Sequence, residues 1–276
     1  MSVRVGILGG TGGMGRLFAR VFQEAGWEVS VRGRTAVEPL ATFLARQDVV
    51  VVSVPIEATV EVIARVAPHL RPDQLLCDLT SLKVAPVAEM SRSPAPAVGL
   101  HPMFGPGVAS LVGQTIVVTP ATATEAECAP LLDLLRRAGA RLTFSTPERH
   151  DRMMAVVQGL THSLTLVMAE TMRRLGCDLD EVLSFTSPVY RIELGIAGRL
   201  LAQDPGLYRE MLRANPHVLP VLAACSGALD DLRDAVAAPG PGPFTRYFEE
   251  NAAAFAEYAP VATAETDRLI RCLVEP

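Results

Sequence analysis

The sequence of 276 residues contains few aromatic side chains, few cysteines and no long apolar run. Aromatic residues make up 5% of the chain, so its core must consist mainly of aliphatic side chains. The five cysteines are dispersed and form no CxxC pair, which argues against a disulfide framework and a zinc site, and we expect no bound metal. No stretch approaches the roughly 18 apolar residues of a membrane span, and no signal-peptide cleavage site follows the N-terminus. We therefore expect a cytoplasmic protein with free thiols.

Charge and composition exclude further classes. The net charge of −5 argues against a protein that grips nucleic acid or an anionic membrane. Because 49% of the residues are hydrophobic, the chain can repay the entropy cost of folding, which excludes disorder. The 21 glycines and 21 prolines form no repeat. A chain of this length is typical of about two domains.

The first half of the chain alternates short β-branched or apolar runs with helical patterns. The expected strands are Val3–Leu8, Glu28–Val31, Val49–Val54, Leu75–Asp78, Ala97–Leu100, Thr115–Thr119 and Arg141–Phe144. Helical patterns between them include Met14–Ala25, Ala58–Ala67 and Glu125–Ala138. Strand, helix and strand at this spacing predict parallel pairing through right-handed crossovers. We therefore predict an α/β, Rossmann-type dinucleotide-binding domain over residues 1–147.

The second half, residues 148–276, is predicted to be an all-α domain. His150–Leu175 reads as one long helix, and four or five more are expected before Cys272. Several breakers fall within Ala237–Pro243, which predicts a loop between helices. These Ala-, Leu- and Met-rich helices offer more apolar surface than a small bundle can bury, so we expect a homodimer through this domain.

A glycine-rich turn follows the first expected strand and precedes the first helix. It reads Gly10-Thr11-Gly12-Gly13-Met14-Gly15, a GxGxxG pattern in the context that dinucleotide binding requires. Gly10 permits the tight turn, Gly12 lets the backbone approach a pyrophosphate, and Gly15 lets the helix pack against the sheet. The sequence therefore predicts an NAD- or NADP-binding turn.

The second expected strand lacks the acidic residue that usually binds the adenosine ribose of NAD. The chain there reads Val31-Arg32-Gly33-Arg34. Guanidinium groups suit a 2′-phosphate, and no acid is present to repel one. Arg32 and Arg34 therefore favour NADP over NAD, although both could equally be solvated surface arginines.

Three further segments carry polar groups near strand ends or in the helical half. They are Asp78–Lys83, Gly99–Pro106, and the pair Gln158–Ser163 and Ser187–Glu193. The prolines and glycine of Gly99–Pro106 predict an irregular loop that holds His101. A lone histidine is more often structural than catalytic, and we interpret His69, His150 and His217 in that way. Arg191 could merely pair with Glu193 or with another acidic residue.

Several of these segments together resemble the prephenate dehydrogenase family. The likeness rests on Gly9–Phe18, Ser53–Ile56, Asp78–Lys83, Gly99–Pro106 (GLHPMFGP) and Ser187–Tyr208 (SPVYRIELGIAGRLLAQDPGLY). It is strongest to the dehydrogenase part of bifunctional chorismate mutase/prephenate dehydrogenases. The chain shows no mutase segment before Val3 and no regulatory domain after Cys272, so it also resembles stand-alone 4-amino-4-deoxyprephenate dehydrogenases.

The resemblance implies a role for each matching residue. His101 resembles the catalytic histidine that accepts the proton of the ring 4-hydroxyl, and Ser81 resembles the serine that orients them. Lys83 lies where the family places a lysine near the cofactor. The resemblance implies that Arg191, which suits a carboxylate, binds the anionic substrate together with His162 and Tyr190. It also implies that Ser53 and Pro55 bind the cofactor.

The implied reaction is an NAD(P)-dependent oxidative decarboxylation in aromatic amino acid biosynthesis. Prephenate would give 4-hydroxyphenylpyruvate for tyrosine, whereas the 4-amino analogue would give 4-aminophenylpyruvate for antibiotic precursors. Thr161 stands where we associate the bifunctional enzymes with a basic residue, so both substrates, and arogenate, stay open. Two other classes also remain: a β-hydroxyacid dehydrogenase or imine reductase, and a non-catalytic dinucleotide sensor.

Overall fold

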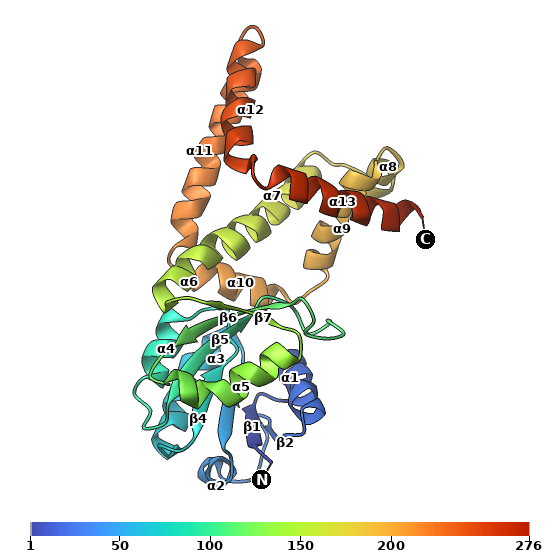
Figure 1. Ribbon diagram of the computed structural model, residues 1–276. Helices are drawn as coiled ribbons and strands as arrows, with labels where there is room; N and C mark the ends of the chain where they lie inside the picture. The colour runs from blue at the N-terminus through green and yellow to red at the C-terminus, as the bar shows by residue number, and fades with distance from the viewer. Residues whose placement is uncertain (1, 276) are drawn as a thin grey trace. The chain divides into compact units, whose positions relative to one another are not determined.

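The computed structural model describes residues 2–275, which divide into two compact units. The first consists of residues 2–155 and 209–215, and the second of residues 156–208 and 216–275. Each unit is described by itself (Figure 1). The first unit continues past the division at residues 147 and 148 that the sequence suggests, because His150 and Asp151 are buried in it.

A seven-stranded sheet forms the centre of the first unit (Figure 1). Its strands are β1 (Arg4–Leu8), β2 (Glu28–Arg32), β3 (Val49–Val52), β4 (Leu75–Asp78), β5 (Ala97–Pro102), β6 (Thr115–Pro120) and β7 (Arg141–Phe144). They lie in the order β2-β1-β3-β4-β5-β6-β7. The predicted Rossmann-type α/β fold is confirmed, and each expected strand is present with shifts of one or two residues at several ends.

One pair of neighbouring strands departs from the expected parallel arrangement. β6 runs antiparallel to β5, with His101 opposite Val117, and β7 is parallel to β6. The connection over residues 103–114 contains no helix that could carry the chain back across the sheet, so the strand returns directly beside β5.

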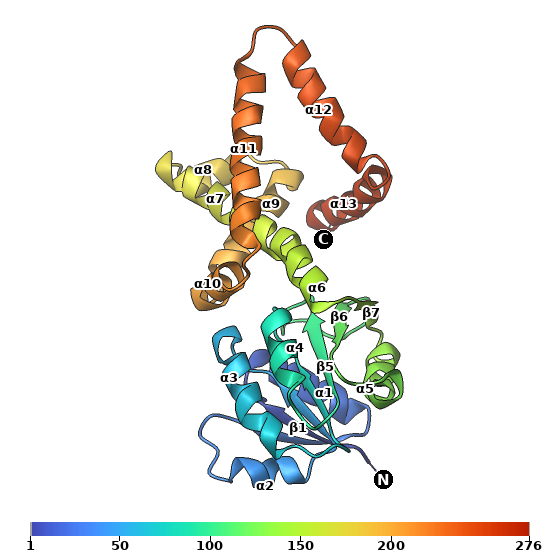
Figure 2. The ribbon, with the colours of Figure 1, turned by 90° about the vertical axis from the view of Figure 1, so that its left-hand side faces the viewer.

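Helices cover both faces of this sheet. On one face lie α1 (Gly13–Glu24) and α5 (Glu125–Arg137), whose buried side chains join an apolar cluster with the sheet. A second cluster on the other face includes α2 (Leu40–Ala45), α3 (Ile56–Val66) and α4 (Val84–Met90). Figure 2 shows α3 and α4 on one side of the strands and α5 on the other. The short η1 (Ala67–His69) follows α3, and α6 (Pro147–Met154) follows β7.

The carboxyl ends of four neighbouring parallel strands lie at one edge of the sheet. Leu8 of β1 pairs with Val52 of β3, Val52 with Asp78 of β4, and Asp78 with Gly99 of β5. Ligands of open α/β sheets bind beyond such ends. The loops that follow these strands carry the glycine-rich turn and most of the polar candidates.

The second unit is helical, as predicted, but differs in detail. The expected long helix has a π-helical turn in its middle: α6 is followed by η2 (Ala155–Leu160) and then α7 (Thr161–Arg174). Weak helix formers within this turn, the β-branched Val156 and Val157 and then Gly159, accompany the irregularity.

Six helices follow in the described part of the chain, where four or five were expected. They are α8 (Leu179–Ser184), α9 (Pro188–Leu201), α10 (Pro205–Arg213), α11 (Val218–Ala237), α12 (Gly242–Phe255) and α13 (Ala259–Val274). The predicted break after Ala237 is present, but α12 already begins at Gly242, because Pro243 is tolerated in a first helical turn. Within the unit, α7 and α13 contact α9, and α11 contacts α12.

Much apolar surface of the helical unit is uncovered. No residue of α8, α12 or α13 is buried, and exposed side chains include Phe185 at 85% and Leu219 at 75%. None of the helices in residues 2–275 combines the length and apolar character needed to cross a membrane.

Candidate active site

The glycine-rich turn connects β1 to α1, as predicted. A Cβ atom on Gly15 would lie 2.5 Å from the carbonyl oxygen of Gly9, and one on Gly10 would lie 2.7 Å from the Val31 side chain. At Gly12 a Cβ atom would meet only the Gly9 oxygen, at 3.2 Å. Packing within the protein therefore requires glycine at positions 10 and 15, whereas at Gly12 the added atom would point mainly into open space.

The start of α1 offers the features that a pyrophosphate needs. Gly12 provides no side-chain cap, and the first turn contains no acidic residue. The backbone N–H groups of Gly13, Met14 and Gly15 therefore have no capping side chain from these positions. These groups and the positive end of the helix favour a bound phosphate. The turn therefore fits a dinucleotide, with Gly12 leaving the space for it and Thr11 exposed beside it.

The remaining cofactor candidates surround this turn. Ser53 and Pro55 lie between β3 and α3, and the backbone oxygen of Ser53 leaves room only for a glycine at Gly9, whose φ is +77°. From the loop after β5, Pro106 packs against Gly13, because a Cβ atom there would lie 2.8 Å from its Cγ. The loop that follows His101 is thus in contact with the glycine-rich turn.

Arg32 ends β2, at the position where an acid would bind the ribose of NAD. Its guanidinium lies over the ring of Phe43, at 5.8 Å from the ring centroid, and its Nη1 atom is buried without a hydrogen-bond partner among the described residues. A buried, unpartnered donor at this place fits an anionic ligand group. Arg34, in contrast, is exposed.

His101 lies within β5 and not in a loop, which corrects the expectation from its prolines and glycine. Its side chain is 2% exposed. Burial is the main cause that holds its pKa well below the ordinary value of 6.5, and electrostatic repulsion between a protonated His101 and the neighbouring His150 and Lys83 adds to it. The imidazole is therefore neutral near pH 7 and has a lone pair that can accept a proton.

The contact of His150 with His101 is the feature of the site that sequence reasoning missed, since we interpreted His150 as a structural histidine. Pro147 and the capping hydroxyl of Thr146 start α6, and this places His150 inside the first unit with 1% exposure. Its Nε2 atom lies 2.8 Å from Nδ1 of His101, and its Nδ1 atom lies 2.7 Å from Oδ1 of Asp151. No spacing motif joins residues 101 and 150, so the sequence offered no signal for this pair.

Asp151 connects α6 to the loop after β4. Its carboxylate accepts hydrogen bonds from the backbone N–H of Lys83 at 2.8 Å and of Val84 at 3.0 Å, where Lys83 provides no side-chain cap for α4. Burial alone would raise the pKa of Asp151, but the hydrogen bonds from His150 and from these two N–H groups outweigh it and lower the pKa. Asp151 is therefore an ionised carboxylate at neutral pH.

Lys83 is completely buried, and its Nζ atom lies 2.5 Å from Oδ2 of Asp78. Gly99 of β5 leaves room for the aliphatic part of this lysine, since a Cβ atom there would lie 3.0 Å from its Cδ. Burial raises the pKa of Asp78 and lowers that of Lys83 in spite of their mutual attraction. The Lys83 side chain thus packs against Asp78 of β4 and Gly99 of β5, while Ser81, two residues earlier, is half-buried in the loop.

The other histidine candidate lies in the helical unit. The ring of His162, on α7, meets that of Tyr208 edge to face, with centroids 5.1 Å apart. Burial lowers the pKa of His162, so it too is neutral near pH 7. Beside it, the hydroxyl of Thr161 donates to the carbonyl of Val157 at 2.6 Å.

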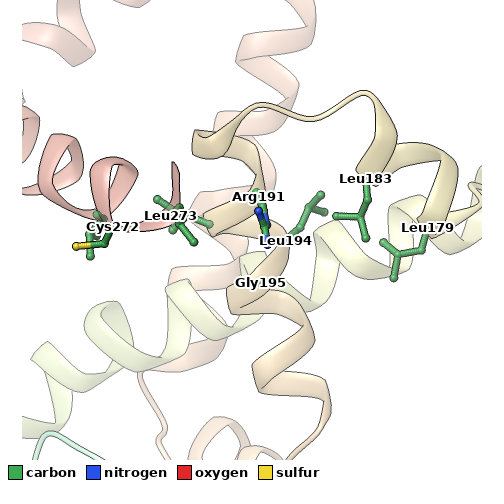
Figure 3. A pocket seen from close by; sticks show the side chains of 9 residues that line it. Leu179, Leu183, Arg191, Leu194, Gly195, Cys272 and Leu273 are labelled. Atoms are coloured by element: carbon green, nitrogen blue, oxygen red, sulfur yellow. The ribbon is translucent and has the colours of Figure 1, made fainter. Parts of the chain in front are cut away.

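Tyr190 and Arg191 lie in the first turn of α9, and both are exposed. Arg191 forms no ion pair with Glu193 or with any other acidic side chain in residues 2–275 (salt bridges of this region join other residues). It lines a mainly apolar pocket of about 540 Å³, which Figure 3 shows with leucines of α8, α9 and α13 around it. The alternative in which Arg191 merely pairs with Glu193 is therefore wrong.

No group of three or more potential metal ligands gathers in the described residues. The first unit instead combines the glycine-rich turn Gly10–Gly15, called the dinucleotide cradle below, with the buried, neutral His101 at the same sheet edge. A Rossmann-type unit with a glycine-rich turn at the carboxyl ends of its strands, followed along the chain by a helical unit, is typical of dinucleotide-binding proteins.

Comparison with known proteins identifies the family. Residues 22–144 match the model of the prephenate dehydrogenase nucleotide-binding domain, and residues 146–250 match that of the prephenate dehydrogenase dimerization domain. Together the two matches cover well over half of the chain. The chain belongs to the prephenate dehydrogenase family.

Relatives with different names show the breadth of this family. A probable arogenate/prephenate dehydrogenase of Methanocaldococcus jannaschii is 30% identical over 99% of this chain, which spans 65% of that protein's length. A 4-amino-4-deoxyprephenate dehydrogenase of Streptomyces pristinaespiralis is 28% identical over 95% of this chain and 93% of its own.

A solved structure supports the fold. Prephenate dehydrogenase from A. aeolicus, in complex with hydroxyphenyl propionate and NAD+, superposes with a TM-score of 0.73. The superposition covers 96% of this chain and 99% of that one at 19% identity. This likeness shows that the two proteins share a fold.

Proposed function

We propose that this protein catalyses the NAD(P)-dependent oxidative decarboxylation of a prephenate-type cyclohexadienyl substrate. The observation that carries the proposal is His101, a buried and neutral histidine at the sheet edge that also bears the dinucleotide cradle. A bound nicotinamide would supply the acceptor for the hydride that leaves C4 of the ring. Loss of the ring carboxylate as carbon dioxide then yields an aromatic product.

His101 is the proposed base. Its imidazole accepts the proton of the 4-hydroxyl, or of the 4-ammonium group in the amino analogue. Ser81, from the neighbouring strand end, orients that group. Lys83 acts in two ways: its charge contributes to the lowered pKa of His101, and its backbone N–H donates to Asp151, which contacts His150.

Arg191, His162 and Tyr190 are the proposed substrate-binding residues of the helical unit. Because Arg191 has no acidic partner among the described residues, its fork is available for a carboxylate of the substrate. His162 is neutral and partly buried, and it can donate or accept a hydrogen bond without adding charge.

Prephenate and its 4-amino analogue are both proposed as substrates, with prephenate as the broader default of the family. The names of the two relatives support both choices, and arogenate also appears in one of them. Thr161 is uncharged, unlike the basic residue of the bifunctional enzymes, and its hydroxyl donates to the helix backbone. A few contacts at C4 would therefore decide between a hydroxyl and an amine.

NADP is the proposed cofactor in preference to NAD. The support is the buried, unpartnered Nη1 of Arg32 and the absence of an acid at the end of β2. The exposed Arg34 would add a second positive charge near the 2′-phosphate. A homodimer through the helical unit is also proposed, because its helices leave apolar side chains exposed and residues 146–250 match a dimerization domain.

The proposal is tested by mixing the purified protein with NAD or NADP and with prephenate or 4-amino-4-deoxyprephenate. Formation of reduced nicotinamide is followed by its absorbance, and the aromatic product is identified by mass spectrometry. We expect turnover with at least one of the four pairings. Absence of turnover with all four would overturn the proposed function.

A further inference from the structure

Three buried side chains form a continuous chain of hydrogen bonds in the first unit. Asp151, His150 and His101 are 4%, 1% and 2% exposed. The carboxylate of Asp151 lies 2.7 Å from His150 Nδ1, and His150 Nε2 lies 2.8 Å from His101 Nδ1. We propose that Asp151 and His150 are positioning residues that hold His101 in the tautomer whose Nε2 atom is unprotonated.

The direction of each hydrogen bond follows from the chemistry of the groups. An ionised carboxylate can only accept, so the proton between Asp151 and His150 resides on Nδ1 of His150. With its ring proton on Nδ1, His150 accepts at Nε2, so the proton between the two histidines resides on Nδ1 of His101. The unprotonated nitrogen of His101 is therefore Nε2.

The Asp151 carboxylate is itself held in place from a second element. Oδ1 accepts from the Lys83 N–H as well as from His150, and Oδ2 accepts from the Val84 N–H. These bonds fix the carboxylate at the start of α4. They also favour its ionised form, so the acceptor at the end of the chain is present at neutral pH.

This arrangement also stabilises the positive charge that develops on His101 when it takes the substrate proton. The inference rests on the proposed reaction in this respect. When the substrate O–H bond breaks, the proton forms a new N–H bond at His101 Nε2, and no other bond in the chain changes. The imidazolium then donates from Nδ1 to His150, which donates in turn to the negative Asp151. The other charged groups near this chain, Lys83 and Asp78, are paired with each other.

Two substitutions separate positioning from a purely structural role. In Asp151→Asn, one carboxylate oxygen becomes an NH₂ group, which faces a group that donated to Asp151. Where the NH₂ group faces His150 Nδ1, the proton of His150 must move to Nε2, and His101 then takes the opposite tautomer. In His150→Gln, the side chain can still accept from His101 Nδ1 but cannot also bridge to Asp151.

The expected kinetic result is specific. Asp151→Asn should lower kcat by roughly 10²- to 10⁴-fold with KM for the substrate changed by less than about threefold. His150→Gln should retain more activity than His150→Phe, because it restores one hydrogen bond. His69→Gln and Asp133→Asn, which alter an exposed histidine and a surface aspartate, serve as matched controls that keep wild-type rates.

A second readout does not depend on activity. In protein labelled with ¹⁵N-histidine, NMR should show His101 protonated at Nδ1 and unprotonated at Nε2, and the opposite tautomer should gain population in Asp151→Asn. This tautomer result without turnover on any substrate would refute the proposed function and leave the positioning chain intact. Folded Asp151→Asn and His150→Phe proteins with wild-type kcat, or a wild-type His101 protonated at Nε2, would overturn the inference.

Discussion

His101 of β5 and His150 of α6 share a hydrogen bond of 2.8 Å between Nδ1 and Nε2, with their ring planes 68° apart. The two residues are 49 positions apart in the chain, and both are buried. The orientation of the proposed base is thus set by a helix that follows the sheet. We therefore expect the action of His101 as a base to depend on the folding of the segment around residue 150.

His101→Asn should lower kcat by roughly 10²- to 10⁴-fold, the range that a general base contributes, with little change in KM. The amide fits the space but cannot take up the proton. Steady-state kinetics at saturating cofactor provide the measurement. Near-normal turnover of this variant would show that His101 is not the base.

The pH profile of kcat/KM should retain full activity as the pH falls through 6.5. His101 can act only while unprotonated, and its pKa is held well below 6.5, so activity is lost only when the pH reaches that lowered value. The measurement is kcat/KM against pH, since this ratio reports groups of the free enzyme. An acid limb centred at 6.5 or above would contradict the assignment.

Gly12→Ala and Gly15→Ala should fail in different ways. At Gly15 the new Cβ would lie 2.5 Å from a backbone oxygen, which should lower the free energy of unfolding by about 1–3 kcal/mol. At Gly12 it meets only one atom, at 3.2 Å, so stability should change little while the KM for the dinucleotide rises at least tenfold. Thermal unfolding and cofactor titration separate the two effects. Equal loss of stability in both variants would contradict this account of Gly12.

Arg32→Ser should reduce kcat/KM for NADP by at least tenfold and leave that for NAD nearly unchanged. The reason is that the unpartnered guanidinium is proposed to bind the 2′-phosphate, which NAD lacks. Arg34→Ser, at an exposed position, should have a smaller effect. Parallel kinetics with the two cofactors measure the difference, and an equal loss with both would remove the basis for preferring NADP.

Arg191→Gln should chiefly raise the substrate KM, by roughly 10- to 100-fold, because the side chain is proposed to bind a substrate carboxylate. Arg268→Gln, on an exposed face of α13, is the matched control. Kinetics of both variants should show a change for Arg191 alone. A decrease confined to kcat would point to a role of Arg191 other than binding.

The sheet was predictable because its strands are short, apolar and bounded by glycine and polar turns. The continuous run Val49–Val52, for example, is covered on both faces and fully buried. The glycine-rich turn was predictable too, because its pattern is local. The antiparallel pairing of β6 with β5 was not predictable, since it depends on a connection that contains no helix.

The site shows the opposite balance. His101 was identified by its surrounding motif, but its place inside β5 and its contact with His150 depend on tertiary packing. His150 and Asp151 look like ordinary polar residues at the start of a helix. The buried pairing of Lys83 with Asp78 also required the fold, because both residues lie near a strand end that could equally face solvent.

The most direct test of the central claim is the stoichiometry of the proposed reaction. Carbon dioxide released from the ring carboxylate and reduced nicotinamide formed are measured together, with the wild-type protein and with His101→Asn. The account predicts one carbon dioxide for each reduced nicotinamide in the wild type, and loss of both in the variant. Reduced nicotinamide without carbon dioxide, or neither product from any substrate pairing, would contradict it.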